Sequence, residues 1–524
     1  MQELRSLGFL FYDESRDLFD FHPILRSYLY GQLISSGGTG VHKLAAQYFE
    51  AMPKPEKVVT LEDLTPVIEH YHHMVKAGNY DEAHDLFENR ISKPTYFQLA
   101  AYHLQIELLK ELFPGGEIDG QLPLLKKESG QAHSLNELAN AYAFSGQPAK
   151  AVPLYLLQNK LREKGDDKKN LAIGLENTAL MAQVYIGQLS AGAGHLRKSI
   201  ALCSEIKAEL WEAVGRQELG RVLAYQGNTC AEEELAKSTA YDERTKDYQG
   251  LSLDFAHRSL SALFQARLAT VLPQKENSSQ KHSRMALHQA RQALRFVEKY
   301  AKKDYPKPRD FVQAYWLLGE ALIQSASGAK YSEPLKFKIP FYDDYFQQVV
   351  ETVTVTNSAK TDLIAAGRCI HEALRRCRKA NMVEFEPDIL LAHVRLDVVQ
   401  SKPPDETLLK EAFEIALRSG YRLKLADLHL FCGQVLLHLK DKKSLLGLTA
   451  TEHLQKTKEY ALDMSEFSHL YSPVKSTADE FYKDIPEYEM LKRGMTHKER
   501  IKNGYWIAYQ IAEILEKQPT NDTN

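Results

Sequence analysis

The sequence lacks the features that mark a secreted, membrane-spanning or strongly charged protein. It has 5 cysteines in 524 residues, an odd number without a CxxC pair, which argues against a disulfide framework. Its formal net charge is only −3, so it has no overall attraction to nucleic acid or to an anionic membrane. The most apolar run, residues 428–439, is interrupted by His429, Gln434 and His438 and is too short to span a bilayer. We therefore expect a cytoplasmic protein that has no signal peptide and no membrane partner.

Motifs for catalysis and for phosphate binding are also missing. The chain contains no GxSxG, no HExxH and no kinase motif set. The glycine-rich stretch 37–40 with Lys43 has the wrong spacing for a phosphate loop, and no strand precedes it. We predict that the chain is not an enzyme, has no catalytic residues and binds no cofactor. A concealed enzyme would need a site that these motifs do not reveal.

Two clusters of polar residues also have a simpler interpretation than a functional site. His70, His72 and His73 suggest a metal, but only His70 and His73 share a helix face and no further ligand lies nearby, so we predict no metal site. The basic run 375–379 has no interleaved aromatic residues. We interpret it as a solvated helix face and expect no nucleic-acid partner.

What the sequence does contain is a repeated helical hairpin, clearest between residues 134 and 162. In both halves of this stretch apolar residues recur with the period of a helix: Leu135, Leu138, Ala139 and Tyr142 in the first, Ala151, Leu154 and Tyr155 in the second. Between them, Gly146 can take the positive φ of a tight turn, and Pro148 falls in the first turn of the second helix. The pattern predicts an antiparallel αα-hairpin.

The hairpin recurs along the chain. Gly187 and Gly227 occupy the same turn position as Gly146, at successive distances of 41 and 40 residues. Further on, Ala373-Leu374 and Ala416-Leu417 are 43 residues apart in the same pattern. Because a single hairpin cannot bury its own apolar face, neighbouring copies must stack on one another. The sequence therefore predicts an all-α solenoid of αα-hairpins.

These hairpins resemble tetratricopeptide (TPR) repeats, in a longer form of about 40 residues. The residues that match the signature of that family are Leu138, Ala139, Tyr142, Gly146, Ala151 and Tyr155, with Gly187, Gly220 and Gly227 in later copies. The resemblance implies a groove lined by the first helix of each hairpin. Its groove positions map to Asn136, Asn140, Asn177, Gln217 and Arg221. Side chains at such positions can bind a peptide backbone, so we expect a protein or peptide partner, and solvated surface is the alternative interpretation.

The first 36 residues have a different pattern. Gly8–Asp13 and Leu18–Phe21 read as two short strands around a polar turn, and Pro23 opens a helix. This pattern resembles the second half of a winged helix, and Phe21-His22-Pro23-Ile24-Leu25-Arg26 resembles a stretch of STAND-type signalling NTPases. Residues 420–439 also resemble the terminal TPR units of STAND proteins. The alternative is a β-hairpin cap on a helical solenoid.

Together these patterns predict five segments. They are a partial winged-helix-like segment (1–36), a helical arm with degenerate repeats (41–130), TPR repeats (131–250), irregular helical repeats with loops (251–363), and C-terminal TPR-like repeats with a cap (364–524). Within the fourth segment, the run VVETVTVT at 349–356 fits either a strand or a misplaced helix.

The STAND resemblance implies a non-catalytic sensor region. Such a region binds a trigger or partner and regulates an NTPase module, which this chain does not contain and which would be supplied in cis or by an adjoining gene. The chain then looks like a C-terminal fragment, a split gene product or a chain with a mis-assigned start. A free-standing TPR adaptor or scaffold protein that binds partner peptides is the alternative.

Overall fold

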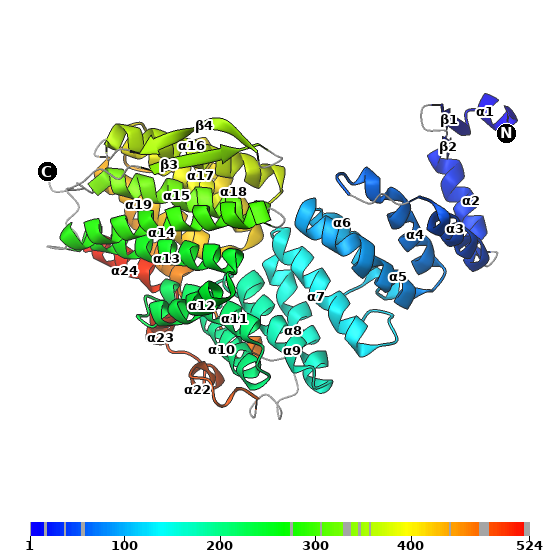
Figure 1. Ribbon diagram of the computed structural model, residues 1–524, viewed down its shortest axis with the longest axis horizontal. Helices are drawn as coiled ribbons and strands as arrows, with labels where there is room; N and C mark the ends of the chain where they lie inside the picture. Colours follow the sequence, from blue (N-terminus) through cyan, green and yellow to red (C-terminus); the bar gives the residue numbers. More distant parts are fainter. Residues whose placement is uncertain are drawn as a thin grey trace. The chain divides into compact units, whose positions relative to one another are not determined.

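The structure is a computed structural model in which two compact units are distinguished (Figure 1). The first unit comprises Met1–Leu99 with Glu107–Gly130, and the second comprises Ala100–Ile106 with Gln131–Asn524. The described residues are 2–14, 18–35, 38–53, 58–272, 276–303, 307–328, 337–343, 347–355, 358–439, 442–470 and 481–517. Residue 37 of the glycine-rich stretch and residues 518–524 lie outside these ranges.

The first unit begins with a short helix and a β-hairpin and continues as helices. Its elements are α1 (Gln2–Ser6), β1 (Leu10–Asp13), β2 (Leu18–Phe21), α2 (Pro23–Ser35), α3 (Thr39–Ala51), η1 (Glu62–Leu64), α4 (Thr65–Lys76), α5 (Tyr80–Leu86), the π-helical segments η2 (Phe87–Ser92) and η3 (Pro94–Gln98), and η4 (Pro114–Gly116). Helices α6 (Tyr102–Lys110) and α7 (Glu128–Phe144) contribute residues to both units.

The predicted N-terminal strands and the helix that follows them are confirmed. Strands β1 and β2 pair antiparallel, with Phe11 opposite Asp20 and Tyr12 opposite Phe19. Pro23 opens α2 because its fixed φ suits the first helical turn and its missing N–H is not needed there. Further on, the α4–α5 hairpin turns at Gly78, which has a φ of +80°. The first unit therefore joins a two-stranded sheet to helical hairpins.

The second unit is a succession of helical hairpins. Its helices are α8 (Pro148–Lys164), α9 (Lys168–Asn177) continued by η5 (Thr178–Gln183), α10 (Leu189–Glu205), α11 (Glu209–Tyr225), α12 (Ala231–Thr245), α13 (Tyr248–Val271), α14 (Glu276–Lys303), α15 (Pro308–Gly328), α16 (Ala359–Lys379), α17 (Glu386–Val399), α18 (Glu406–Ser419), α19 (Arg422–His438), α20 (Ala450–Ala461), η6 (Phe467–His469), α22 (Glu487–Lys492), α23 (His497–Asn503) and α24 (Trp506–Glu516). This succession confirms the predicted all-α solenoid.

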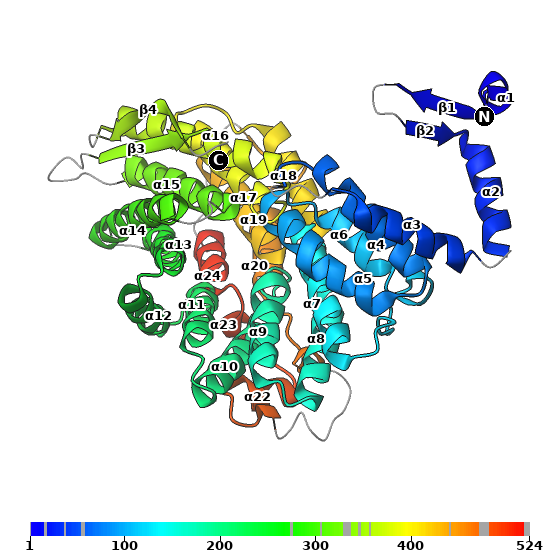
Figure 2. The ribbon, with the colours of Figure 1, turned by 45° about the vertical axis from the view of Figure 1, so that its right-hand side comes forward.

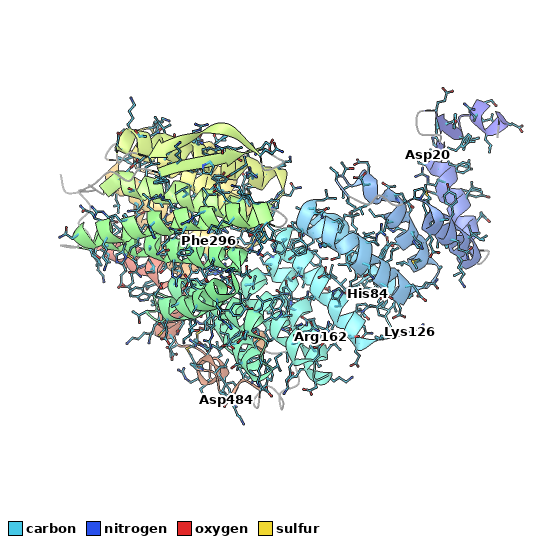
Figure 3. The ribbon with its side chains drawn as sticks, in the orientation of Figure 1. Asp20, His84, Lys126, Arg162, Phe296 and Asp484 are labelled. Carbon is cyan, nitrogen blue, oxygen red and sulfur yellow. The ribbon has the colours of Figure 1, made fainter. Side chains whose placement is uncertain are left out.

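The repeat signature positions pack as the period predicts. Leu138, Ala139, Ala151 and Tyr155 are completely buried between α7 and α8, and Tyr142 is 5% exposed. The turns that follow the first helices have positive φ at Gly146, Gly187 and Gly227 (82°, 79° and 64°), a region that glycine enters without strain. At the start of α9, Asp167 accepts a hydrogen bond from the Asn170 amide. Asp167 also forms an ion pair of 2.8 Å with Arg162, which is labelled in Figure 3.

The run 349–356, which fits either a strand or a helix by sequence, lies mostly in a strand. Strand β4 (Gln348–Val355) pairs antiparallel with β3 (Phe337–Tyr342). This second β-hairpin packs on α15, where the Phe341 ring stacks on Tyr315 at 5.5 Å and the Tyr315 hydroxyl donates to the Pro340 carbonyl. Ile339 is completely buried. The second unit is therefore helical with one β-hairpin covering a helix pair.

The last helix of the second unit packs against a helix from much earlier in the chain. Helix α24 packs against α13, α19 and α20 (Figure 2). Its Tyr505 N-cap and its Ile507 and Ile511 belong to the same buried core as Leu219 and Phe264. The last helix therefore shares its core with residues of α11 and α13.

Candidate functional site

The five predicted groove residues lie on the first helices of the repeats, and the structure gives each a partner in its own chain. The Tyr155 hydroxyl donates to Asn140 Oδ1 at 2.6 Å, and Asn177 Nδ2 donates to Asn136 Oδ1 at 3.1 Å. Asn140 is 6% exposed, whereas Asn136 and Asn177 are half-buried. These side chains connect neighbouring helices of the solenoid. Partner binding at these positions stays a prediction.

Gln217 on α11 is 3% exposed, and the Arg221 side chain on the same helix is 11% exposed. Gln217 Nε2 donates to the Gly250 carbonyl and to Asp254 Oδ1, at 2.9 and 2.8 Å. Arg221 Nε donates to Glu218 Oε2 at 2.7 Å. Burial alone lowers the pKa of Arg221, but the Glu218 carboxylate outweighs it and the pKa is raised. Gln217 therefore holds α11 to α13, whereas Arg221 pairs within α11 and reaches a neighbouring element only through a hydrogen bond of 3.4 Å to the Leu180 carbonyl.

Further charged groups lie deeper in the same unit, around a small cavity of about 30 Å³. Glu320 on α15 pairs with Arg395 of α17 at 2.8 Å and with Arg267 of α13 at 2.5 Å. Burial raises the pKa of Glu320, but the two arginines outweigh it and the pKa is lowered. The cavity can hold a water molecule and is far below the few hundred Å³ of a typical ligand pocket.

Positive and negative groups balance around this cavity. Lys424 pairs with Asp388. The Tyr505 hydroxyl donates to Asp427 at 3.0 Å, and burial raises the pKa of Asp427 to about 6. Four cations, Arg221, Arg267, Arg395 and Lys424, and three acids, Glu320, Asp388 and Asp427, line the cavity, and Arg221 pairs outside the lining with a fourth acid, Glu218. We conclude that the ion pairs of this network link α13, α15, α17 and α19 and that each cation already has an acidic partner.

The sequence prediction missed this network. Its members are single charged residues inside apolar helical runs, such as Glu320 within WLLGEALI. A charged residue on the core-facing side of a helix is the signal that could have predicted this network, because charged side chains are buried only when they are paired.

The basic run 375–379 differs from its sequence interpretation as a solvated face. Arg376 is 5% exposed; it donates to Glu372 at 2.6 Å and to the Tyr342 carbonyl at 2.8 Å. Arg378 pairs with Glu386 and Glu411, each at 2.6 Å. The interpretation as a solvated face is wrong for Arg376, because this side chain faces the β3–β4 hairpin.

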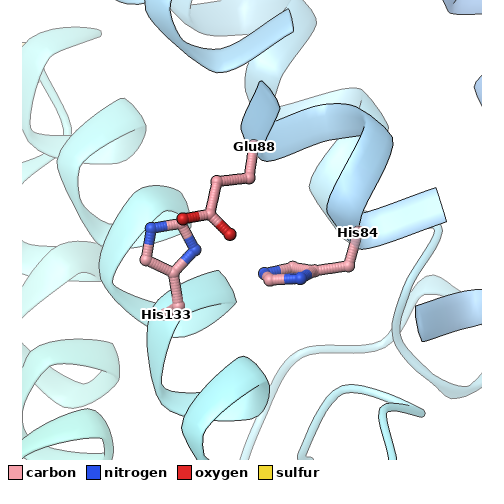
Figure 4. Close-up of side chains that lie close together, drawn as sticks. All are labelled: His84, Glu88 and His133. Carbon is pink, nitrogen blue, oxygen red and sulfur yellow. The ribbon is translucent and has the colours of Figure 1, made fainter. Parts of the chain in front are cut away.

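The histidines that suggested a metal contact different residues. His73 Nδ1 lies 2.9 Å from Nδ1 of His42, and His72 Nδ1 lies 3.0 Å from Glu111 Oε2. His70 is buried in α4. Figure 4 shows another pair in the first unit, His84 and Glu88, one helical turn apart. The third labelled residue, His133, belongs to the second unit, and two ligands alone do not form a zinc site.

The N-terminal hairpin carries apolar side chains on both of its faces. Tyr12 and Phe19 pair on one face, with ring centroids 4.6 Å apart, and Leu10 on that face is 3% exposed. On the other face Phe9 and Phe11 are 43% and 52% exposed, and Phe19 is 49% exposed although its ring pairs with Tyr12. Exposed side chains also continue into the following helices: Ile24, Tyr28 and Leu29 on α2, and Val41, Leu44 and Tyr48 on α3. Exposed apolar side chains that gather in one patch are typical of surfaces that contact another protein.

The residues of the predicted His-Pro stretch join this hairpin to α2. Arg26 of α2 forms an ion pair with Asp20 of β2, which is labelled in Figure 3. His22 Nδ1 accepts from the Ile24 amide at 3.4 Å, at the start of the helix. The motif therefore sets the direction in which α2 leaves the sheet.

Comparison with known proteins assigns no family. No family model matches the chain, and no curated protein matches its sequence. Among solved structures the chain is similar to a circular tandem repeat protein with novel repeat topology and enhanced subunit contact surfaces, at 12% identity over 92% of this chain and 95% of that chain, with a TM-score of 0.20. It is also similar to the structure of Naa15/Naa10 bound to HypK-THB, at 12% identity over 92% of this chain and 73% of that chain, again with a TM-score of 0.20. Likenesses this distant carry no argument about fold or partners.

No helix among the described residues is both long and apolar enough to cross a bilayer.

Proposed function

We propose that this chain is the partner-binding sensor arm of a STAND-type signalling NTPase. In this proposal the helical repeats bind a protein trigger, and the N-terminal hairpin docks on the NTPase module, supplied in cis or by an adjoining gene. The chain itself performs no chemistry and works in the cytoplasm.

The exposed face of the β1–β2 hairpin is the observation that carries the proposal. An isolated two-stranded sheet is marginally stable in water, and this one leaves Phe9 and Phe11 open to solvent. The hairpin precedes the His22-Pro23 helix start, as in the winged helix that the sequence resembles. A winged helix supplies, from its earlier helices, an apolar surface that would cover these two rings.

The buried charge network supports the non-catalytic part of the proposal. Its carboxylates and arginines are paired with one another, and the cavity between them holds no more than water. Charged groups that are already paired with one another are not free to act on a substrate.

The coding sequence upstream of the chain is the first test. We expect it to encode, in frame or in an adjoining gene, the earlier helices of a winged helix and a P-loop NTPase. An unrelated gene at that position contradicts the proposal and favours a free-standing TPR adaptor.

A further inference from the structure

We propose that the outer face of α14 binds the sugar–phosphate backbone of a duplex nucleic acid. This helix lies in the second unit, where it packs against α13 and α15 (Figure 1). The inference goes beyond the proposed function and does not depend on the STAND assignment. We call the surface the basic stripe; its residues are Lys281, Arg284, His288, Arg291, Arg295, Lys299 and Lys302.

The basic stripe follows the period of the helix. Its members are three or four residues apart, so their side chains leave the same side of α14. Six of the seven are exposed, and Arg291 is half-buried. From residue 281 to residue 302 the stripe is about 30 Å long, at the rise of an α-helix. The opposite side of α14 packs in the main core through Ala286, Leu287, Ala290, Ala293, Leu294 and Val297.

The charge of α14 differs strongly from that of the whole chain. The chain has a formal net charge of −3, whereas α14 has seven lysines and arginines against two glutamates, a formal charge of +5. One of these glutamates, Glu298, is half-buried, and burial raises its pKa. The near-neutral net charge of the chain therefore does not describe the electrostatic potential at this face.

Cations of the basic stripe lack the acidic partners that other surface cations have. Arg258 on the adjacent α13, for example, pairs with Glu232 at 3.0 Å. In the part of the chain that the structure describes, no salt bridge reaches Lys281, Arg295, Lys299 or Lys302. Like charges in a row repel one another, so a bound polyanion would relieve this repulsion.

Aromatic rings hold two members of the stripe in place. The Phe296 ring, labelled in Figure 3, stacks on Tyr248 of α13 with centroids 6.1 Å apart. Lys299 Nζ lies 5.1 Å from the centre of the Tyr248 ring and 5.2 Å from that of Phe296. Arg291 Cζ lies 3.7 Å from the centre of the Phe337 ring on β3. These cation–π contacts orient the cations, and rings covered in this way are not available to stack on bases.

The composition of this face favours nucleic acid over a membrane or a protein. A membrane-binding helix inserts an exposed apolar face, whereas the apolar face of α14 lies in the core. Protein interfaces are poor in lysine and depend on apolar or aromatic anchors. Met285 is the one exposed large apolar side chain that the structure describes on α14. Interfaces with nucleic acid are more polar and much more positive, as this face is.

The packing of α14 indicates which part of a nucleic acid it can reach. A recognition helix enters the major groove, but α14 is flanked by α13 and α15, so its outer face can reach phosphates and not base edges. The stripe of about 30 Å is close to one turn of a duplex, about 34 Å. A rigid row of phosphates also needs less ordering on binding than a flexible strand does. We therefore expect binding that is independent of sequence and falls steeply with salt.

The test is fluorescence anisotropy with the full chain and a labelled DNA duplex of about 20 base pairs. We expect saturable binding with a Kd on the order of 1 µM or lower at about 50 mM salt, and at least about a hundredfold weaker binding at about 200 mM. A duplex of unrelated sequence should bind within about twofold of the first. An RNA duplex of the same length is the second probe, and the tighter of the two identifies the source of the phosphates.

A triple substitution locates the binding surface. Lys281→Gln, Arg295→Gln and Lys302→Gln together should weaken binding at least about tenfold and lower the slope of log Kd against log salt by about 3. The matched control, Lys169→Gln with Arg418→Gln and Lys498→Gln, removes the same charge from exposed positions on other helices and should stay within about threefold of the wild type. Both variants change exposed side chains, so both should melt within about 2 °C of the wild type.

Three results would overturn the inference. The first is no saturable binding of either duplex at the lower salt concentration. The second is an equal loss of affinity in the two triple variants. The third is binding of a poly-glutamate peptide or of phosphatidylserine vesicles that is as tight as binding of the duplexes.

Discussion

At the scale of single residues, buried hydrogen bonds join the first helix of each hairpin to its neighbours. The Asn140–Tyr155 bond at 2.6 Å and the Gln217–Asp254 bond at 2.8 Å are examples. The helical period predicted the face on which Asn140 and Gln217 lie. It could not predict that this face is covered, because the atoms that cover it come from other helices.

Asn140→Ala should lower the free energy of unfolding by about 1–3 kcal/mol, since it leaves the buried Tyr155 hydroxyl without an acceptor. Tyr155→Phe in the same chain removes that hydroxyl, so the double variant should recover part of the loss. Urea unfolding measures both. An Asn140→Ala variant as stable as the wild type would mean that Asn140 is free to contact a partner.

A second residue prediction concerns two buried carboxyl groups. Asp242 and Asp254 are hydrogen-bonded to each other, and burial together with the Asp254 charge raises the pKa of Asp242. The folded pair keeps a proton that the unfolded chain gives up near pH 4, so its contribution to stability is lost as the pH rises through the raised pKa.

Asp242→Asn should therefore raise the free energy of unfolding at pH 8 by about 1 kcal/mol, which urea unfolding would show as a higher midpoint. At pH 4 the same substitution should change the free energy of unfolding little. Glu243→Gln, an exposed neighbour, is the control and should have no such pH dependence. A uniform effect of Asp242→Asn at both pH values would show that the pair does not share a proton.

At the scale of elements, the glycine turns of the early repeats meet helices from late in the sequence. A Cβ on Gly146 would lie 2.9 Å from Val383, one on Gly187 would lie 3.1 Å from Arg422, and one on Gly227 would lie 2.4 Å from the Trp506 ring. The sequence predicted these turns from glycine spacing. It held no signal for the close contacts, which join residues more than 200 positions apart.

Gly227→Ala should destabilise the second unit more than Gly420→Ala does. Both glycines have positive φ, 64° and 68°, so both variants strain the backbone by about 1 kcal/mol. Only position 227 has a ring in the way, since nothing lies within 4 Å of a Cβ at 420. Equal melting temperatures for the two variants would show that α24 does not depend on this turn.

The β3–β4 hairpin marks the limit of prediction from local pattern. Alternating Val and Thr at 349–356 suited a strand, but the surrounding helices favoured another helix. The decision came from tertiary contacts, in which Ile339 and Phe341 of β3 cover α15. Strand propensity depends strongly on such contacts, so the pattern alone left both possibilities open.

At the scale of the whole molecule, the proposal requires an arm without nucleotide chemistry of its own. Calorimetric titration of the purified chain with Mg-ATP should give no saturable heat, because the sequence holds no phosphate loop and the 37–43 stretch has the wrong spacing. Saturable micromolar binding would contradict the non-enzymatic assignment.

The most direct measurement is binding between this chain and the NTPase module that the proposal requires, in cis or from an adjoining gene, by analytical ultracentrifugation or calorimetry. The account predicts a complex that weakens at least tenfold when Phe9→Ser and Phe11→Ser are combined, because these two exposed rings lie on the face of the hairpin that the proposal places against the NTPase module. Leu210→Ser, an exposed residue on α11, should leave the affinity unchanged. A complex that survives the double substitution, or no complex with the wild-type chain, would contradict the account.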